Sequence, residues 1–158
     1  MQGDRSPPTI NNCPIDIYED AIAARRYAFV TWAEPTAWDS KEGTVSVTLG
    51  GSNRPGDPFF EGSTNIGYYA KDKSGNMATC NFVIHINVVR CAVLATNIPD
   101  GYRICHPSSD MVKGTVCRYG CYQGHDLKGP SRSECTETGD WSIVQEPYCE
   151  SAITIQNF

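Results

Sequence analysis

Eight cysteines in a chain of 158 residues constrain the fold more than any other feature of the sequence. Thiols are scarce in cytosolic proteins of this size, whereas small secreted domains use disulfide bonds to stabilise cores that are too small to be stable alone. The even number of cysteines indicates a disulfide framework. We therefore expect a protein that is secreted or displayed at the cell surface.

The spacing of the cysteines divides the chain into two parts. Two of them, Cys13 and Cys80, lie far apart, and the other six crowd into the last third of the chain: Cys91, Cys105, Cys117, Cys121, Cys135 and Cys149. A chain of this length has room for one ordinary domain or two small ones. We therefore expect two modules of different design.

Charge and hydropathy exclude two classes of partner. The chain carries 13 basic and 18 acidic residues and has no basic block, which disfavours nucleic-acid binding. The longest apolar run, residues 82–89, is too short and too interrupted to span a bilayer, so we expect no membrane insertion. The opening residues also lack the apolar core of a signal peptide. We interpret the chain as a fragment of a longer secreted protein, or an incomplete gene model, in preference to a cytosolic protein.

The first part of the chain has the composition of strands separated by turns. Four segments are rich in β-branched and aromatic residues: 27–35, 43–51, 63–72 and 77–89. Between them lie the turn-forming stretches "WDSKEG", "NRPGDP" and "KDKSGN". No long segment has a helical period, so the sequence predicts an all-β, antiparallel sandwich.

Alternation within the last of these segments places Cys80 in the core. One face of the strand is apolar throughout, since it carries Cys80, Phe82, Ile84, Ile86 and Val88. Cys13, Ile15 and Ile17 show the same alternation near the start of the chain, which makes Cys13 the natural partner of Cys80. Closing so long a loop is worth about 4 kcal/mol in the chain-entropy model.

The stretches "INNCP", "AFVTWAEPTAWDS" and "PGDPFFEGSTNIGYYAKDKSGNMATC" closely resemble the hyalin-repeat (HYR) module of extracellular proteins. The resemblance implies an immunoglobulin-like sandwich and a role in cell–matrix adhesion. We assign the module to residues 9–90 and expect residues 1–8 to form a disordered segment. The sequence departs from the family pattern at "WDSKEGT", where Asp-Asn is frequent, and we expect this to alter only a loop.

The stretches "GTVCRYGCYQGHDLKGPSRSEC" and "TGDWSIVQEPYC" resemble a sushi (complement control protein) domain over residues 91–149, followed by a tail at residues 150–158. Six cysteines permit fifteen pairings, so spacing alone does not give the bonds. The resemblance implies Cys91 with Cys135 and Cys121 with Cys149. It leaves Cys105 and Cys117 as an extra pair, which is similar to the six-cysteine variant of selectins and sushi-repeat proteins.

Two other uses of these cysteines are disfavoured. A zinc site favours C-x-x-C pairs or histidines at ligand spacing, and Cys117, Cys121, His106 and His125 do not have that spacing. A thioredoxin-like centre needs C-x-x-C beside a parallel β-α-β unit, and neither is present.

No residue carries a pattern typical of catalysis, so we expect a non-enzyme without catalytic residues or a cofactor. His85 has the opposite parity to Cys80 and should lie on the outer face of its strand, and no nucleophile stands at motif spacing. Asp39, Asp72 and Asn76 could supply oxygen ligands to calcium. The local sequence favours turn formation for these residues instead, so we expect no metal site.

One surface patch has the composition of a protein-binding site. Arg118, Tyr119 and Tyr122 lie close together in the sequence and near His125, and Tyr and Arg are typical binding anchors. The alternative is that tyrosine packs against a disulfide bond.

The tandem of modules resembles part of the sushi-repeat-containing proteins and of mosaic proteins that combine sushi, EGF, pentraxin and von Willebrand modules. It implies a protein-interaction module of adhesion or matrix assembly, with extracellular or cell-surface proteins as partners and glycans as a second class. Two other interpretations stay open, a complement-type recognition module and the non-catalytic arm of a secreted mosaic enzyme, because a fold does not fix a function.

Overall fold

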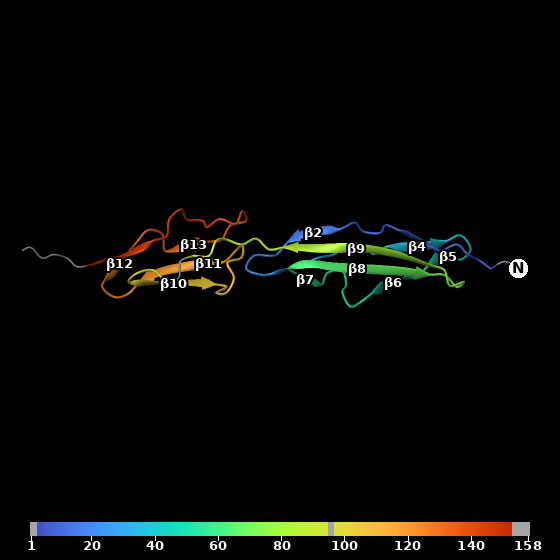
Figure 1. Cartoon of the computed structure of the whole chain (residues 1–158), viewed down its shortest axis with the longest axis horizontal. Helices are drawn as coiled ribbons and strands as arrows, with labels where there is room; N and C mark the ends of the chain where they lie inside the picture. Colours follow the sequence, from blue (N-terminus) through green and yellow to red (C-terminus); the bar gives the residue numbers. More distant parts are fainter. Residues whose placement is uncertain (1–2, 95–96, 153–158) are drawn as a thin grey trace, which may run out of the picture. The chain divides into compact units, whose positions relative to one another are not determined.

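The computed structural model describes residues 3–94 and 97–152, and its regular structure there is all β, as the sequence predicts (Figure 1). The chain divides into two compact units, Met1–Ala21 with Tyr27–Asn87 and Ile22–Arg26 with Val88–Phe158. No helix in the described residues is long and apolar enough to cross a membrane.

Three sheets make up the first unit. The largest has the order β2-β9-β8-β6, and β2 runs parallel to β9 while the other pairs are antiparallel. The second has the order β1-β4-β5, and β3 pairs with β7. The strands are β1 (Thr9–Asn11), β2 (Ile17–Asp20), β3 (Tyr27–Phe29), β4 (Thr36–Asp39), β5 (Gly43–Val45), β6 (Val47–Gly50), β7 (Pro58–Phe60), β8 (Gly62–Lys71) and β9 (Met77–Asn87).

The long β8–β9 hairpin carries the core of this unit. Alternate residues of β9 are buried, as the parity of the sequence predicts: Cys80, Phe82, Ile84 and Ile86. The expected alternation ends there, because β9 stops at Asn87 and Val88 is only half-buried. Trp32 packs edge-on against Phe59 and Phe82, and its indole N–H donates to the Tyr68 hydroxyl at 2.8 Å. The indole therefore fills the core without leaving its polar atom unpaired.

The structure corrects the expected strand around Cys13. Cys13 is exposed, Ile15 is 85% exposed, and the strand begins only at Ile17. Asn12 adopts a positive φ of 58°, and Pro14 has no N–H to give to a ladder, so this segment cannot extend a strand backward from β2. Cys13 nevertheless forms a disulfide bond with Cys80.

The turn expected at "WDSKEG" is shorter than predicted. Trp38 and Asp39 are the last residues of β4, where they pair with β5, and the turn itself occupies only residues 40–42. The pairing of β4 on both sides, with β1 and with β5, extends the strand into the turn-rich sequence.

The segment before β1 is attached to the first unit. The side-chain amide of Asn76 donates to the backbone carbonyl of Asp4 at 3.2 Å, and Pro8 is buried. The disorder expected for residues 1–8 is therefore not a feature of residues 3–8.

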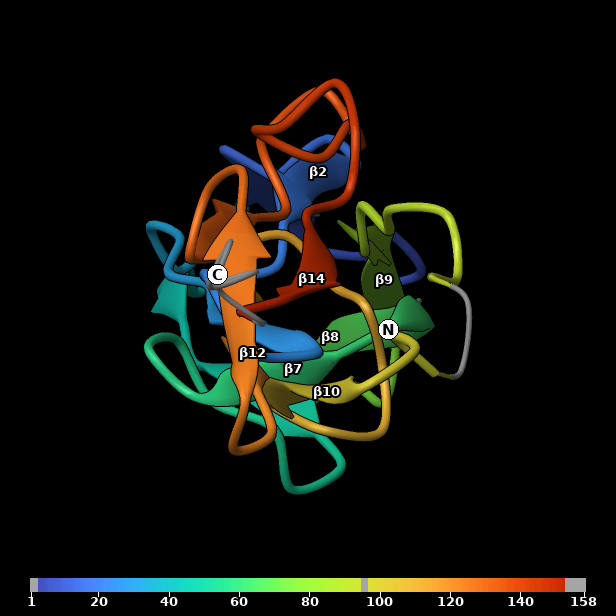
Figure 2. The same cartoon turned by 90° about the vertical axis from the view of Figure 1, so that its left-hand side faces the viewer.

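The second unit is a small disulfide-rich β-module. One sheet has the order β10-β11-β13, and β12 pairs with β14 beside it (Figure 2). The strands are β10 (Gly101–His106), β11 (Val116–Cys121), β12 (His125–Lys128), β13 (Arg132–Glu134) and β14 (Tyr148–Ser151). β14 therefore enters the expected tail, whose residues 153–158 lie outside the described ones.

All the cysteines are in disulfide bonds, which join Cys13–Cys80, Cys91–Cys135, Cys105–Cys117 and Cys121–Cys149. The first is the pair that the parity of Cys80 favours, and the other three are those that the resemblance to a sushi domain implies. In the second unit, the Cys105–Cys117 bond lies in the core beside Ile98 and Tyr119. A core of this size depends on covalent cross-links for its stability.

Candidate binding surfaces

The solvent-facing side of β10, β11 and β13 gathers side chains that commonly anchor protein interfaces. The register pairs Tyr102 with Gly120, Ile104 with Arg118, and Arg118 with Arg132, so these residues share one face of the sheet. Tyr102 is 44% exposed and Ile104 is 52% exposed. We call this surface the Tyr–Ile–Arg face, and with the adjoining Tyr122 it comprises Tyr102, Ile104, Arg118, Tyr122 and Arg132.

Tyr122 extends the Tyr–Ile–Arg face beyond the end of β11. Its ring centroid lies 6.0 Å from that of Tyr102, and the side chain is 60% exposed. Next to Tyr102, the small Gly120 leaves room for the tyrosine ring to lie across the strand. The result is an exposed surface of two tyrosines, an isoleucine and two arginines.

The four residues predicted to form a binding patch do not all share this surface. Tyr119 is buried in the core, because neighbouring residues of a strand point to opposite faces and Arg118 takes the outer one. His125 is half-buried beside Asp100, with 3.6 Å between its Nε2 and the carboxylate. The sequence patch thus contributes only Arg118 and Tyr122 to the Tyr–Ile–Arg face.

Tyr119 anchors β11 from the inside. Its hydroxyl lies 3.0 Å from the Ser133 hydroxyl and 3.5 Å from Glu146, whose carboxylate forms a 2.6 Å ion pair with Arg103. Burial raises the pKa of Tyr119 and the nearby negative charge of Glu146 adds to this, against the opposing effect of the Ser133 hydrogen bond. The phenol therefore stays neutral at ordinary pH and serves as a structural hydrogen-bonding group.

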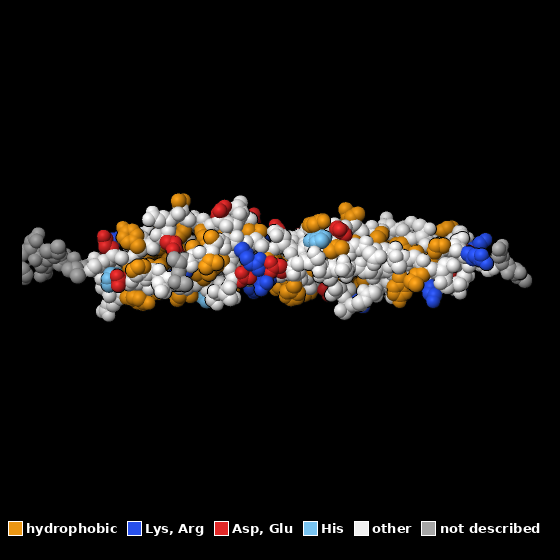
Figure 3. Space-filling model, in the orientation of Figure 1, with side chains coloured by type: hydrophobic (Ala, Val, Ile, Leu, Met, Phe, Trp, Pro, Cys, Tyr) orange, Lys and Arg blue, Asp and Glu red, His pale blue; other side chains and the backbone are white. Residues whose placement is uncertain are grey.

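A second surface is an aromatic cluster on β3 and β7. Tyr27 lies 5.5 Å from both Phe29 and Phe60, measured between ring centroids, and the two phenylalanines are 62% and 64% exposed. Ala28 and Phe59, which alternate with them, face the core. Figure 3 shows exposed hydrophobic side chains, in orange, on the surface of both units.

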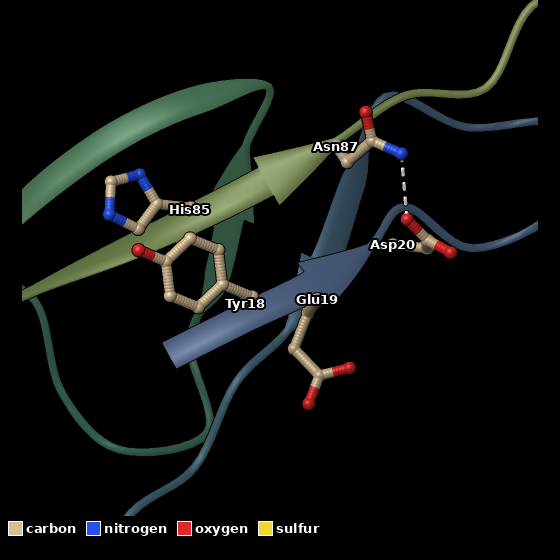
Figure 4. A pocket seen from close by; sticks show the side chains of 5 residues that line it. All are labelled: Tyr18, Glu19, Asp20, His85 and Asn87. Atoms are coloured by element: carbon tan, nitrogen blue, oxygen red, sulfur yellow. Dashed lines mark hydrogen bonds between the residues drawn. The ribbon is translucent and has the colours of Figure 1, made fainter. Parts of the chain in front are cut away.

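A third surface is a shallow hollow of about 340 Å³ between β2 and β9, lined by Tyr18, Glu19, Asp20, His85 and Asn87 (Figure 4). The rings of Tyr18 and His85 stack with their centroids 4.5 Å apart. Asn87 donates to Asp20 at 2.8 Å at the other end of the hollow. The hollow is open to solvent, so it resembles a protein-contact surface more than an enclosed small-molecule pocket.

The same region brings together a serine, a histidine and an aspartate, which is the composition of a hydrolase triad. Ser63 Oγ lies 2.8 Å from His85 Nδ1, and His85 Nε2 lies 3.9 Å from Asp16. Ser63 and His85 are cross-strand partners in the β8–β9 register, which accounts for their contact. Asp16 accepts the backbone N–H of Val83 and is beyond hydrogen-bond reach of the ring. This arrangement is that of an exposed sheet surface, as expected for His85.

Asp39 and Asp72 both form turns, as the sequence predicts. Oδ1 of Asp39 accepts the backbone N–H groups of Lys41 and Glu42, at 2.8 and 3.1 Å. Oδ1 of Asp72 accepts the N–H of Asn76 at 2.8 Å, and Oδ2 accepts its side-chain amide at 2.7 Å. These are the local bonds that make Asp frequent in turns.

Comparison with known proteins matches both units. The HYR domain profile matches residues 3–86, and the sushi repeat (SCR repeat) profile matches residues 91–149. Human sushi repeat-containing protein SRPX2 is 36% identical over 140 residues, which is 88% of this chain and 29% of that protein. The rat protein of the same name is 35% identical with the same coverage, and human sushi repeat-containing protein SRPX is 31% identical over 147 residues, 92% of this chain and 31% of that protein. The chain therefore spans less than a third of the length of these relatives.

Proposed function

Because the chain belongs to the HYR domain family and carries a sushi repeat after its HYR domain, we propose that it is an extracellular protein-interaction module that acts in cell adhesion or matrix assembly. Both modules are non-catalytic, in agreement with the absence of a catalytic pattern in the sequence. We assign the HYR domain to residues 9–90 and the sushi domain to residues 91–149.

The observation that carries this proposal is the Tyr–Ile–Arg face. Binding hot spots are enriched in tyrosine and arginine, which combine a large apolar contact area with polar or charged groups at the tip. Tyr102, Ile104 and Tyr122 expose apolar area on the outer side of the sheet. Arg118 borders them, as does Arg132, whose charge is paired with Glu134 at 2.7 Å. A partner with an aromatic surface and an acidic group opposite Arg118 therefore fits this face.

An extracellular setting is supported by the bonding of every cysteine. Four disulfide bonds, with no free thiol, form and persist in an oxidising compartment. The partners that such a module meets are secreted and cell-surface proteins, and glycans attached to them form a second class. A complement-type role and an arm of a mosaic enzyme have no specific observation in their favour.

The experiment is a binding assay on cultured cells and on the matrix that they deposit. The chain, secreted from eukaryotic cells and clustered on a multimeric carrier, is applied to both surfaces and the bound amount is measured across a concentration series. The double variant Arg118→Ser/Tyr122→Ser should weaken binding by about tenfold or more, because it removes two central anchors of the Tyr–Ile–Arg face.

Tyr69→Ser is the matched control, since Tyr69 is 41% exposed on β8 and belongs to none of the three surfaces. It should bind as the wild type does. Absence of wild-type binding to both cells and matrix would exclude the adhesion role. Equal binding by the double variant and the wild type would be consistent with an adhesion role, but it would show that the binding site lies outside the Tyr–Ile–Arg face.

A further inference from the structure

Three carboxylates meet at one end of the first unit, outside the surfaces described above. Asp4, Asp39 and Asp72 each place one carboxylate oxygen within 4.8 Å of the others. They come from the segment before β1, from the end of β4 and from the residue after β8. Asp39 and Asp72 are almost fully buried, at 1% and 4% exposure, so water screens their mutual repulsion poorly.

Turn formation explains part of this arrangement. It accounts for Oδ1 of Asp39 and for both oxygens of Asp72, which accept N–H groups of the following turns. Turn formation does not explain why these two turns lie next to each other, or why Asp4 lies beside them. Asn76 holds Asp4 in place through the backbone carbonyl, since its side-chain amide donates both to that carbonyl and to Asp72.

Asp39 provides the observation that points to a ligand. Its Oδ2 is buried and has no hydrogen-bond partner among the described residues. A buried carboxylate oxygen without a donor is costly, and such groups in native proteins are generally hydrogen-bonded or bound to a metal. Because Oδ1 already accepts two N–H groups, Oδ2 is the oxygen that Asp39 has left to offer.

The oxygens have the spacing and chemistry of ligands to a calcium ion. Two oxygens on opposite sides of Ca²⁺ lie roughly 4.6–5.2 Å apart, because each Ca–O bond measures about 2.3–2.6 Å. All three carboxylates can therefore reach one ion. A hollow lined by Gly3, Asp4, Arg5 and Lys41 exposes the Asp4 side of the cluster to solvent.

We propose that Asp4, Asp39 and Asp72 form a calcium-binding site that ties the segment before β1 to the turns that follow β4 and β8. The ion neutralises the repulsion among the three carboxylates and uses the unpaired Oδ2 of Asp39. The ion also attaches the segment before β1 to the rest of the first unit. Of the three ligands, Asp4 alone lies outside the paired strands and the turns that join them. The site does not depend on the proposed adhesion role.

The experiment is calcium titration of the intact, fully disulfide-bonded chain after removal of divalent ions. Calorimetry should give a saturable site with a Kd of about 0.1–1 mM, the range of extracellular modules. The backbone NMR signals of Lys41, Glu42 and Asn76 should shift with the same Kd, because their N–H groups bind the ligating carboxylates. At 10 mM CaCl₂ the Tm of the first unit should rise by about 5–10 °C.

Asp39→Asn and Asp4→Asn should each weaken calcium binding by tenfold or more. Asp4→Asn guards against misfolding, because Asp4 lies outside the strands. Its carboxylate accepts the N–H of Ser6, a bond within its own segment. Asp57→Asn is the matched control, since Asp57 accepts the N–H of Arg54 in a turn but lies outside the cluster. It should bind calcium as the wild type does.

Three results would overturn the proposal. The first is a correctly bonded wild-type chain whose NMR spectrum and Tm do not change at 10 mM CaCl₂. The second is an equal response of the wild type and of all three variants, which would mean diffuse binding to surface charge. The third is binding of Mg²⁺ with the same affinity as Ca²⁺. Mg²⁺ requires shorter bonds and octahedral geometry, so equal affinity would mean that the three carboxylates do not form a site selective for calcium.

Discussion

Single side chains in the second unit hold the Tyr–Ile–Arg face from behind. Arg103 lies between Tyr102 and Ile104 on β10, so its side chain points to the opposite side of the strand and is only 9% exposed. There it forms the 2.6 Å ion pair with Glu146, which also lies 3.5 Å from the Tyr119 hydroxyl. This pair links β10 and β11 to the segment before β14.

We predict that Glu146→Gln lowers the free energy of unfolding of the second unit by about 1–3 kcal/mol, because it removes a charge-assisted bond to a buried guanidinium. Urea titration followed by the NMR signals of β10 and β11 measures this value. The control is Glu134→Gln, which weakens the exposed pair with Arg132 and should cost less than about 1 kcal/mol. An equal decrease in the free energy of unfolding in the two variants would show that the buried ion pair contributes no more to stability than the exposed one.

The carboxylate of Asp72 makes the stability of the first unit depend on pH. Burial raises its pKa, but the hydrogen bonds from the side chain of Asn76 and from the backbone of Asn76, Ser74 and Gly75 lower it more, so it lies below the ordinary value of 3.8. A group whose pKa is lower in the folded chain stabilises the fold above its unfolded pKa. That contribution is lost as the pH falls through the folded pKa.

We therefore predict that, in EDTA, the first unit loses stability as the pH falls below about 4, and that Asp72→Asn loses less over the same range. Urea midpoints measured from pH 6 down to pH 2.5 test this. The informative quantity is the slope against pH, since the variant also changes a hydrogen bond at every pH. Parallel curves for the two proteins would contradict the assignment.

At the level of elements, the close approach of β10 and β11 depends on two glycines whose replacement should have different effects. A Cβ on Gly101 would lie 2.5 Å from both Cys149 Sγ and the Gly120 carbonyl oxygen, and both atoms are fixed. The atoms nearest to a Cβ on Gly120 would belong to the side chain of Tyr102, which is 44% exposed and can turn away. Neither glycine has a positive φ, so alanine tests space alone.

We predict that Gly101→Ala destabilises the second unit by about 1–3 kcal/mol, as overpacking of a tight contact does. Gly120→Ala should cost less than about 1 kcal/mol, but it should displace Tyr102 and weaken partner binding in the cell and matrix assay. Thermal unfolding of both variants gives the comparison. A larger destabilisation by Gly120→Ala than by Gly101→Ala would contradict the prediction. It would mean that the Tyr102 ring cannot move away from residue 120.

The strands that the sequence predicts best are those with long alternation. Segments 63–72 and 77–89 were expected to be strands and correspond to β8 (Gly62–Lys71) and β9 (Met77–Asn87). The short strands β1, β4 and β7 carry too few residues for a period of two to emerge, and their positions are fixed by pairing with distant partners. The alternation of Cys13, Ile15 and Ile17 predicts a strand that is absent there, because Pro14 interrupts the backbone hydrogen bonding of this segment.

The same limit applies to the candidate sites. The proximity of Arg118 and Tyr122 in the sequence predicts that they share a patch, whereas Tyr102 and Ile104 join them only through the register of β10 with β11. Asp39 and Asp72 drew attention as turn residues, but Asp4 reaches them only in the folded unit. Sequence reasoning therefore found the residue types of each site and missed the members that distant pairing supplies.

At the level of the whole molecule, each disulfide bond joins two cysteines of the same unit. Cys13–Cys80, with a sequence separation of 67, lies in the first unit, although its loop includes Ile22–Arg26 of the second. The other three, with separations of 44, 12 and 28, lie in the second unit. The first unit depends on one long cross-link and on the β8–β9 core. The second has three cross-links and a smaller core. The spacing of the cysteines predicts this division, because two lie far apart in the first part of the chain and six crowd into the last third.

We predict that the effect of each bond stays within its own unit. Replacing Cys13 and Cys80 by alanine should lower the free energy of unfolding of the first unit by about 4 kcal/mol, the chain entropy of a loop of that length. The matched variant, with alanine at Cys105 and Cys117, should cost the second unit about 3 kcal/mol, because its loop is shorter. In each variant the other unit should keep the protection that it has in the wild type.

Native-state hydrogen exchange under non-reducing conditions, resolved by peptide, measures both units in one experiment. Protection of β8 and β9 should fall in the first variant, and protection of β10 and β11 should fall in the second. Loss of protection across both units in either variant would mean that the chain unfolds as one cooperative body. The predictions for Glu146, Gly101 and Asp72 would then have to be measured on the whole chain, since no substitution could be assigned to one unit.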